Sequence, residues 1–200
     1  MRELVIATHN PHKTAEFREL LQGQFIVSDL SAWNISAPDE TGSTFRENAL
    51  LKALAASRVL PTNLWVLADD SGLEVEALGG APGIHSARYA GVHGNDQANR
   101  TKLLRELNKA GRERRSARFV CALALVAAGN LKAEFEGTVE GRIALVETGR
   151  RGFGYDSLFI PAPHEQTFAA LSSALKQTLS HRARAVTALL HSLANEHLSV

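Results

Sequence analysis

The hydrophobic positions of the chain predict a set of strands. Continuous apolar runs at residues 4–7 and 64–68 and the mostly apolar stretch at residues 117–127 have the length and composition of buried strands, and residues 24–29 form a further candidate. Apolar and polar residues alternate over residues 131–136. This alternation predicts a strand with one face exposed to water.

Four stretches carry apolar residues at helical spacing, and each follows a residue that can cap a helix. The capping residues are Asn10, Thr44, Asn95 or Asp96, and Ser180. Strands that alternate with helices are typical of an α/β domain. Because no linker-like or repetitive segment interrupts the 200 residues, we expect a single domain over residues 1–200.

The strand at residues 64–68 leads directly into two adjacent carboxylates, Asp69 and Asp70, which are followed by Ser71 and a glycine. A buried strand that delivers acids to its carboxyl end is a common way to hold a metal ion or a catalytic base. The same four residues also favour a turn, after which alternation over residues 73–78 predicts a separate edge or hairpin strand. In an extended chain the two acidic side chains point to opposite faces, so one can face a site while the other supports the structure. The pattern alone does not choose between turn and site.

Two predicted helix starts carry cations, which the helix dipole disfavours at that end. Lys13 lies in the first turn after Asn10 and Pro11, and His181 and Arg182 stand at the start of the last helix. A helix start presents N–H groups and a positive dipole end, so it can receive a phosphate. A bound polyphosphate would account for both cationic starts, although an ordinary capped helix explains most of the first one.

Two acids near the second predicted helix have different explanations. Glu47 stands three residues after the capping threonine and matches a capping box, so we favour a structural role for it. Glu40 lies in a polar segment, residues 31–42, that we predict to be a loop, and no local structural role accounts for it. On the helix itself, Asn48 and Lys52 are spaced to share a face.

A second stretch with candidate chemistry, residues 149–156, combines glycines with two aromatic residues. Glycines let a backbone approach a ligand closely, Phe153 and Tyr155 offer flat surfaces for a base, and Asp156 offers an acceptor. The alternative is an ordinary glycine loop before a strand at residues 157–160. The two aromatic residues favour a ligand site.

Composition and charge exclude several classes of protein. The 22 Lys and Arg against 21 Asp and Glu leave a net charge of +1, without the basic excess of a nucleic-acid surface. Cys121 is the single cysteine, so no intrachain disulfide can form and a reduced, cytoplasmic protein is expected. The chain begins without the apolar segment of a signal peptide, and its longest apolar run, residues 119–128, is too short to span a bilayer.

Seven short motifs occur in the order and at the spacing of one family. They are T-H-N-P-H-K (residues 8–13), T-F-R-E-N-A (44–49), A-D-D-S-G-L (68–73), G-G-A-P-G-I (79–84), S-A-R-Y (86–89), G-F-G-Y-D (152–156) and S-H-R (180–182). Together they closely resemble the inosine triphosphate pyrophosphatase family over residues 4 to about 190. Its bacterial members act on the non-canonical purine triphosphates dITP, ITP and XTP. Each motif is weak singly, whereas the ordered set is strong.

The resemblance implies an α/β fold with an elongated mixed central sheet flanked by helices, two lobes with a cleft between them, and usually a homodimer. It implies Mg2+-dependent hydrolysis of a nucleoside triphosphate to the monophosphate and pyrophosphate, which would keep such nucleotides out of DNA and RNA. Carried over by motif, Asp70 would accept the proton of the attacking water and bind Mg2+ together with Glu40. Lys13 would neutralise the charge that develops on the phosphates.

The resemblance also implies a set of substrate contacts. The residues that would hold the triphosphate are Thr8, His9, Asn10, Pro11, His12 and Lys13. The residues that would contact the rest of the nucleotide are Ser71, Phe153, Gly154, Tyr155, Asp156, Lys176, His181 and Arg182. We expect Phe153 and Tyr155 to form a base platform near His181 and Arg182, whose donors would favour a 6-oxo purine. The expected partners are a purine nucleoside triphosphate and a second copy of the chain, with no nucleic acid and no membrane.

Two other functions remain open. One is a different Mg2+-dependent nucleotide phosphohydrolase that releases orthophosphate. It is disfavoured because the first strand ends in Ala7, Thr8 and His9 and lacks a pair of aspartates there. The other is a nucleotide-binding module without catalysis, which would have no need for a water-activating carboxylate. The sequence departs from the family pattern at His85, Ser157 and residues 174–175, but none of these removes a proposed catalytic group.

Overall fold

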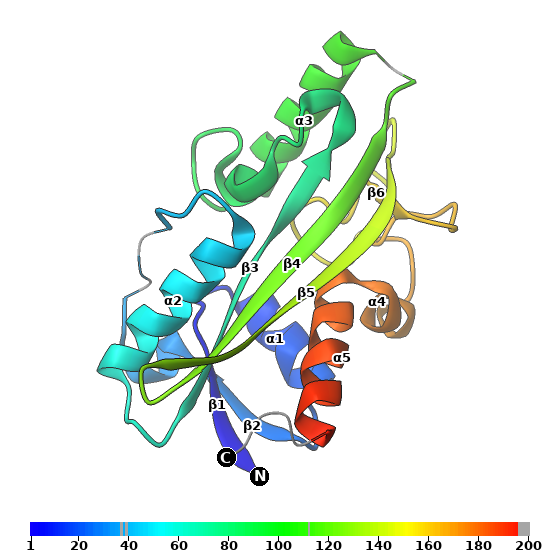
Figure 1. The fold of residues 1–200 in the computed structure, drawn as a ribbon. Helices are drawn as coiled ribbons and strands as arrows, with labels where there is room; N and C mark the ends of the chain where they lie inside the picture. Colours follow the sequence, from blue (N-terminus) through cyan, green and yellow to red (C-terminus); the bar gives the residue numbers. More distant parts are fainter. Residues whose placement is uncertain (37, 39, 112, 196–200) are drawn as a thin grey trace. The chain divides into compact units, whose positions relative to one another are not determined.

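The structure is a computed structural model that describes residues 1–36, 38, 40–111 and 113–195. Its elements (Figure 1) are β1 (Arg2–Ile6), α1 (Pro11–Leu20), β2 (Phe25–Asp29), η1 (Leu30–Trp33), α2 (Phe45–Val59), β3 (Trp65–Val75), η2 (Glu76–Leu78), η3 (Gly83–Arg88), α3 (Asp96–Ala110), β4 (Ser116–Ala127), β5 (Asn130–Ile143), β6 (Phe159–Pro161), α4 (Ser173–Leu179) and α5 (His181–Ala194). The η elements are short 3-10 helices. No helix within the described ranges is long and apolar enough to cross a membrane.

Within the described ranges the strands form a six-stranded sheet in the order β2-β1-β3-β4-β5-β6. Strand β1 pairs in parallel with β2 and β3, and β5 pairs antiparallel with β6. The predicted α/β class, with a mixed sheet flanked by helices, is therefore confirmed. The four predicted helices and the strands expected at residues 4–7, 24–29, 117–127 and 131–136 are all present.

By its internal contacts the chain divides into two compact units. Unit 1 consists of Met1–Asp70, Cys121–Gly137 and Arg182–Val200, and unit 2 consists of Ser71–Val120 and Thr138–His181. Strands β3, β4 and β5 each pass from one unit into the other. Each unit has its own hydrophobic core.

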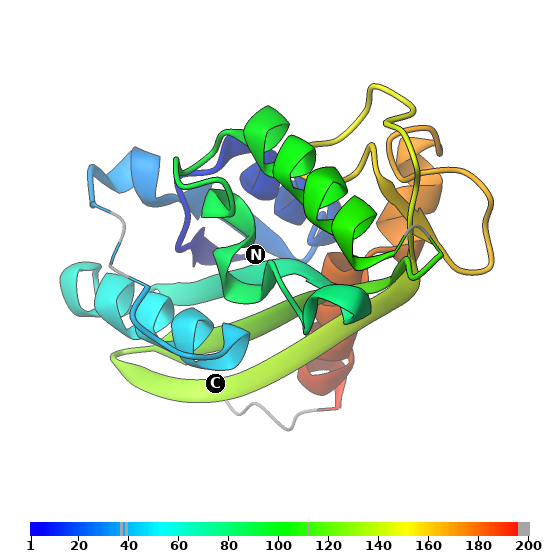
Figure 2. The same ribbon diagram turned by 90° about the horizontal axis from the view of Figure 1, so that it is seen from above.

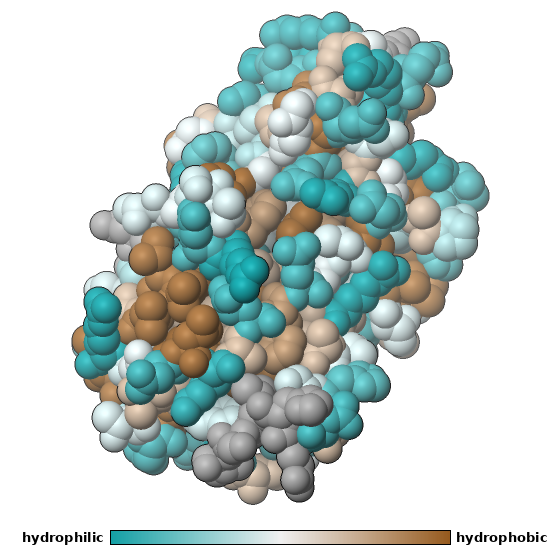
Figure 3. Space-filling view, in the orientation of Figure 1, coloured by the Kyte–Doolittle hydropathy of each residue, from teal (hydrophilic) through white to brown (hydrophobic). Residues whose placement is uncertain are grey.

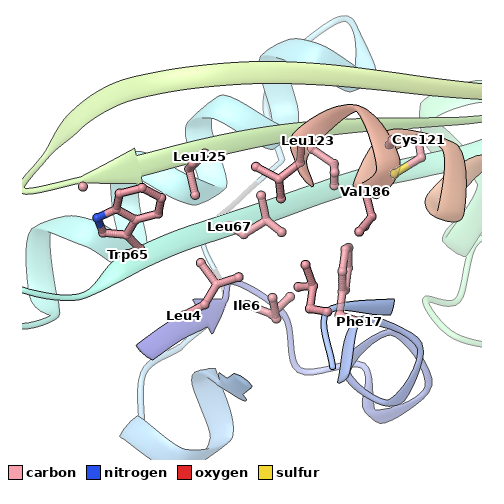
Figure 4. Packing of buried hydrophobic residues seen from close by; sticks show 13 residues of the cluster. Leu4, Ile6, Phe17, Trp65, Leu67, Cys121, Leu123, Leu125 and Val186 are labelled. Carbon is pink, nitrogen blue, oxygen red and sulfur yellow. The ribbon is translucent and has the colours of Figure 1, made fainter. Parts of the chain in front are cut away.

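The core of unit 1 lies between its strands and the helices α1 and α5, which lie side by side (Figures 1 and 4). Its buried members are Leu4, Ile6, Phe17, Leu21, Trp65, Leu67, Cys121, Leu123, Leu125, Ala127, Ala185, Val186 and Leu189. Side chains alternate along a strand, so Trp65 and Leu67 of β3 face these helices while Val66 and Ala68 face the other side. The same alternation sets the direction of the acids that follow in β3.

The core of unit 2 is rich in aromatic side chains. Phe119, Phe159 and Phe168 contact one another, with ring centroids 4.7 to 6.3 Å apart. Leu103 and Leu107 of α3 are fully buried in the same core. Helix α3 also packs against η2 and η3, which Figure 2 shows in teal-green beside it. This packing places the start of α3 among the loops of unit 2.

The acid pair lies inside a strand, so the turn that the sequence left open at residues 69–72 does not form. Strand β3 continues without interruption from Trp65 to Val75, so no separate edge strand forms at residues 73–78. Residues Glu76–Leu78 form η2 instead. The turn preference of Asp and Ser is overridden because both carboxylates bind cations from other elements, as described below. The strand expected at residues 157–160 is shifted to Phe159–Pro161.

Helix α2 carries apolar residues on both of its sides. Ala49 and Ala53 are buried, whereas Leu51 and Val59 are exposed. Figure 3 shows a brown, hydrophobic area at its lower left, where α2 lies in Figure 1. An apolar stripe therefore does not define this helix. Its composition and its capping threonine predicted its bounds, Phe45–Val59.

Candidate functional site

The two adjacent acids of β3 bind different partners. Asp69 contacts Lys13 of α1 and Arg182 of α5, on the face that Leu67 shares. Asp70 contacts Lys52 of α2 through its Oδ1, at 2.8 Å. The predicted divergence of the two side chains is therefore confirmed. It follows from the unbroken strand, in which neighbouring residues point to opposite faces.

Asp69 is the centre of a buried charge network in unit 1. Its Oδ1 accepts a hydrogen bond from Lys13 Nζ, and its Oδ2 accepts from Arg182 Nη2 at 2.9 Å and Nε at 3.2 Å. Arg182 also donates from Nη1 to Glu16, and the Cys121 thiol lies 3.6 Å from Asp69 Oδ2. Burial alone would raise the pKa of the Asp69 carboxyl, but the charges of Lys13 and Arg182 lower the pKa well below its ordinary value.

This network changes the interpretation of the two cationic helix starts. Lys13 and Arg182 each bind a carboxylate of the protein, so a bound polyphosphate is not needed to explain their positions. The first-turn amides of His12 and Lys13 are also bound, because both donate to Asn10 Oδ1, at 2.9 and 3.4 Å. The α1 start is a capped helix with Pro11 in its first turn, as predicted.

Asp70 and Glu40 meet at one ammonium group. Lys52 Nζ donates to Asp70 Oδ1 at 2.8 Å and to Glu40 Oε1 at 3.0 Å. Burial raises the pKa of the Asp70 carboxyl, and the charge of Lys52 acts against that rise. Burial opposes the charge of Lys52, yet Asp70, Asp69 and Glu40 together raise the pKa of its ammonium. The structure thus brings together the two acids that the family resemblance implies as metal ligands.

Lys52 is a site residue that the sequence analysis missed. Its side chain is only 9% exposed, on the buried side of α2 with Ala49, Ala53 and Ala56. A lysine at an inward position of an alanine-rich helix has no apolar role, and this was the available signal. Asn48, one turn earlier, is also buried, and its Oδ1 accepts from the Gly42 amide at 2.7 Å. Two side chains of α2 therefore hold the segment around Glu40.

The donor set around Asp70 fits a divalent cation. Asp70 Oδ2 is buried and has no hydrogen-bond partner among the described residues. A buried carboxylate oxygen without a partner is costly, and a cation would satisfy it. Two carboxylates with space for water and phosphate oxygens are typical of Mg2+, which seldom has an all-protein cage. The described residues contain no group of three or more His, Cys, Asp or Glu side chains that could hold a metal ion.

The segment from Thr8 to Lys13 is fixed from several sides. Thr8 Oγ1 accepts from the Asn10 amide at 3.1 Å, and His9 Nδ1 lies 3.3 Å from Ser31 Oγ. Pro11 and His12 are exposed at the start of α1. The predicted triphosphate residues thus run without a break from the end of β1 into the first turn of α1. The structure itself assigns them no ligand.

Glu47 has the structural role that we favoured. Thr44 Oγ1 accepts from the Glu47 amide at 3.1 Å. The Glu47 carboxylate accepts from the amide and the hydroxyl of Ser43, both at 2.7 Å. Part of the predicted loop at residues 31–42 is η1, and residues 37 and 39 lie outside the described residues.

In unit 2 the glycine-rich loop folds around Asp156. Its Oδ2 accepts from the Phe153 amide at 3.0 Å and from Lys176 Nζ at 2.6 Å. A Cβ atom at Gly152 would lie 1.9 Å from that same oxygen, so only glycine allows this approach. Lys176 Nζ lies 5.3 Å from the centroid of the Phe153 ring. Asp156, Lys176 and Phe153 thus form one cluster.

The two expected platform residues have different surroundings. The Tyr155 ring is 4% exposed within the core of unit 2, and its hydroxyl donates to the Ser86 carbonyl at 2.9 Å. Phe153 is half-buried, so it is the ring that retains exposed surface. His181 is buried and stacks on Phe119, with ring centroids 4.7 Å apart and an interplanar angle of 11°. Ser71 is half-buried and follows Asp70 in β3.

Comparisons with known proteins point to one family. The family model of the Ham1 family matches residues 4–192. The dITP/XTP pyrophosphatase of Shouchella clausii is 48% identical over 190 residues, which cover 94% of this chain and 95% of that protein. The dITP/XTP pyrophosphatase of Geobacillus kaustophilus is 50% identical over 191 residues, with 94% and 93% covered. A solved structure of a HAM1 protein from Coxiella burnetii superposes with a TM-score of 0.87 at 40% identity and covers 98% of this chain and 100% of that one. These matches confirm the family resemblance of the seven motifs.

Proposed function

The chain belongs to the Ham1 family, and on that basis we propose that it hydrolyses non-canonical purine nucleoside triphosphates, namely dITP, ITP and XTP, to the monophosphate and pyrophosphate. The observation that carries this proposal is the buried Asp70 carboxylate. One of its oxygens is bound to Lys52 while the other has no protein partner among the described residues. A carboxylate in that state is suited to accept a proton from water or to bind a cation.

Asp70 and Glu40 would hold the Mg2+ ion that the family resemblance implies. When bound, the ion would offset negative charge on the phosphate oxygens. Asp70 would accept the proton of the attacking water, and its burial favours this role because it raises the pKa of the carboxyl. Lys52 keeps the two acids together through its contacts with both. It would also supply a positive charge beside the phosphates.

Residues of unit 1 would bind the triphosphate. The turn from Thr8 to Lys13 stands at the start of α1, where the helix dipole favours an anion. Lys13 would neutralise charge that develops during phosphoryl transfer. Its contact with the buried Asp69 holds the ammonium in place before substrate binds.

Residues mainly of unit 2 would select the base. Phe153 offers the partly exposed ring on which a purine can stack, while Tyr155 anchors the loop in the core. Lys176, His181 and Arg182 would supply donors that favour a 6-oxo purine over a 6-amino purine. A buried donor that meets an amino group instead of an oxygen costs about 1–3 kcal/mol, which is roughly tenfold to a hundredfold in selectivity. Ser71 and the Gly154 and Asp156 positions would complete the nucleotide contacts.

The remaining expectations are also part of this proposal. The protein would act as a homodimer in the cytoplasm, where it removes these nucleotides before they enter DNA or RNA. Neither nucleic acid nor a membrane would be a partner, in line with the net charge of +1. Light scattering after gel filtration tests the dimer, because a monomer would have a mass of 21.6 kDa.

One experiment tests the activity. The protein is incubated with ITP, XTP, dITP, ATP or GTP, with and without Mg2+, and the released pyrophosphate and orthophosphate are measured separately. We expect pyrophosphate from ITP, XTP and dITP, only in the presence of Mg2+, and far less from ATP and GTP. Orthophosphate as the first product would indicate the alternative phosphohydrolase. Nucleotide binding without any product would indicate a binding module. Asp70→Asn serves as the control for a contaminating activity.

A further inference from the structure

Two side chains of α3 bind both polar groups of one glycine in the loop that carries Phe153. The Gly154 amide donates to Asp96 Oδ2 at 2.7 Å. The Gly154 carbonyl accepts from Arg100 Nη1 at 2.8 Å. Asp96 and Arg100 are four residues apart on the helix and therefore share a face. Both peptide groups of Gly154 are thus fixed by charged side chains, which make stronger hydrogen bonds than neutral ones.

The loop needs such support because its backbone is intrinsically free. Gly152 and Gly154 have positive φ angles of 77° and 60°. Glycine adopts positive and negative φ angles about equally readily, so sterics alone do not hold the backbone in this conformation. Phe153 lies between these two glycines. Its own amide donates to Asp156 Oδ2 at 3.0 Å. The backbone around Phe153 is therefore held at two places. Asp156 binds the Phe153 amide, and Asp96 and Arg100 of α3 bind the following residue, Gly154.

Arg100 is itself held in place. Its Nε donates to Glu147 Oε2 at 2.8 Å, and its Nη2 donates to Gln97 Oε1 at 2.8 Å. Glu147 Oε2 also accepts from the Ser157 hydroxyl at 3.0 Å, just beyond the loop. The Arg100 side chain is 16% exposed. A guanidinium that is largely buried and bound on three of its nitrogens has a defined position, so it can act as a fixed donor to Gly154.

We propose that Asp96 and Arg100 are positioning residues that set the placement of the Phe153 ring and thereby the affinity for the base of the nucleotide. This role rests on the proposed function. It separates base recognition from phosphate chemistry, because neither residue contacts the charge network of Lys13, Lys52, Asp69 and Asp70 in any described interaction. Asp96 also lies in the first turn of α3, where any acid would stabilise the helix dipole. A test must therefore separate positioning from helix stability.

The test compares Asp96→Ala, Asp96→Asn and Arg100→Ala with a control on the same helix, Arg105→Ala. The Arg105 side chain is 62% exposed and forms an ion pair with its neighbour Glu106, so its loss should change little. Kinetics are measured with ITP and with ribose 5′-triphosphate, which lacks a base. Asp96→Ala should raise KM for ITP about tenfold, the effect of losing one charge-assisted hydrogen bond. The KM for ribose 5′-triphosphate should stay the same, and kcat for ITP should change far less than KM.

Asp96→Asn separates the hydrogen bond to Gly154 from the effect of the negative charge on the helix dipole. An asparagine loses the charge that favours the helix dipole but keeps an oxygen that can accept from the Gly154 amide. We therefore expect its KM for ITP to lie much closer to the wild-type value than that of Asp96→Ala. Hydrogen exchange of the Gly154 amide, followed by NMR, provides a readout without activity. It should be faster in Asp96→Ala than in the wild type or in Arg105→Ala.

The outcomes are distinguishable from a failure of the proposed function. A wild-type protein that releases no pyrophosphate from ITP overturns the proposed function and this role with it. An active wild type whose folded Asp96→Ala variant keeps its KM for ITP overturns this role alone. So does an equal rise of KM for ITP and for ribose 5′-triphosphate, because the effect would then not concern the base. Equal KM values for Asp96→Asn and Asp96→Ala would assign the effect to charge and would also overturn it.

Discussion

In unit 1 the charged candidate site residues other than Glu40 lie on regular elements, whereas in unit 2 Phe153, Gly154 and Asp156 lie on a glycine-rich loop that is held through its backbone. Asp69 and Asp70 are fixed by β3, Lys52 by α2 and Lys13 by α1. Phe153 is fixed by hydrogen bonds to peptide groups of its own loop. Buried charges hold one another in place in unit 1, but each loss leaves an unpaired charge behind. In unit 2, the loss of one of the hydrogen bonds that hold the loop would displace the loop only partly. We therefore expect all-or-none effects in unit 1 and graded effects on affinity in unit 2.

The largest effect is expected for Asp70→Asn in unit 1. The substitution keeps an oxygen for Lys52 and nearly the same shape, so the fold should persist. It removes the proposed proton acceptor, and turnover of ITP should fall roughly 100- to 10,000-fold. Steady-state release of pyrophosphate measures the loss, and circular dichroism checks the fold. Glu74→Gln, which removes a carboxylate from the same strand, is the control and should remain active. Near-normal turnover of Asp70→Asn would exclude Asp70 from the reaction.

Asp69→Asn should act on stability, in contrast to its neighbour. The Asp69 carboxylate forms ion pairs with both Lys13 and Arg182, and both cations lose this negative charge in the variant. Breaking a buried ion pair from one side costs about 3–5 kcal/mol of unfolding free energy. Urea denaturation measures this cost. The control pair is Arg118–Glu74 in unit 2, whose side chains are 50% and 28% exposed. Its loss in Glu74→Gln should cost at most about 1 kcal/mol. Equal costs for the two variants would remove the distinction between the units.

The sequence predicts the elements of both units better than the partners of their charges. The spacing of apolar residues, the capping residues and the apolar runs are signals carried by residues close together in the sequence. These signals predicted the bounds of α2 and the presence of β4 and β5. Local preference did not decide the structure at Asp69 and Asp70, where the turn that the sequence left open is a strand. The reason is not local: Lys13, Lys52 and Arg182 come from three helices and compensate the buried carboxylates. A single sequence does not show which segments lie close together in space, so these ion pairs could not be predicted from it.

The candidate site shows the same division. The alternation of a strand was enough to send Asp69 and Asp70 to different faces, and their different partners agree with it. The two cationic helix starts were visible in the sequence, but their carboxylate partners Asp69 and Glu16 were not. Tyr155 and Phe153 also have the same aromatic character in sequence. Only the fold shows that one ring is buried in the core while the other keeps exposed surface.

In unit 2, Phe153→Ala should weaken binding without stopping the reaction. Stacking of a base on an aromatic side chain is worth about 1–3 kcal/mol, so KM for ITP should rise roughly 5- to 100-fold. The buried Tyr155 and the core of unit 2 remain, and the fold should be unaffected. The ratio of kcat/KM values for ITP and ribose 5′-triphosphate measures the effect of the base alone. A fall in kcat with an unchanged KM would place Phe153 with the residues of unit 1 and contradict the contrast between the units.

The smallest effects are expected when the N-cap residues of α2 and α3 are replaced. Helix α2 carries Lys52, which contacts Glu40 and Asp70, and α3 carries Asp96 and Arg100, which bind Gly154. Thr44 caps α2 by accepting from the Glu47 amide, and Asn95 caps α3 by accepting from the Ala98 amide. Replacing either by alanine should lower the free energy of unfolding by about 1 kcal/mol. The kinetic consequences should differ, because a frayed α2 loosens the segment around Glu40 and should lower kcat, whereas a frayed α3 loosens Asp96 and should raise KM for ITP. Thr101→Ala, whose hydroxyl donates only within α3, is the control. If both cap variants changed kcat and KM in the same proportion, the two units would not divide the work of chemistry and base recognition.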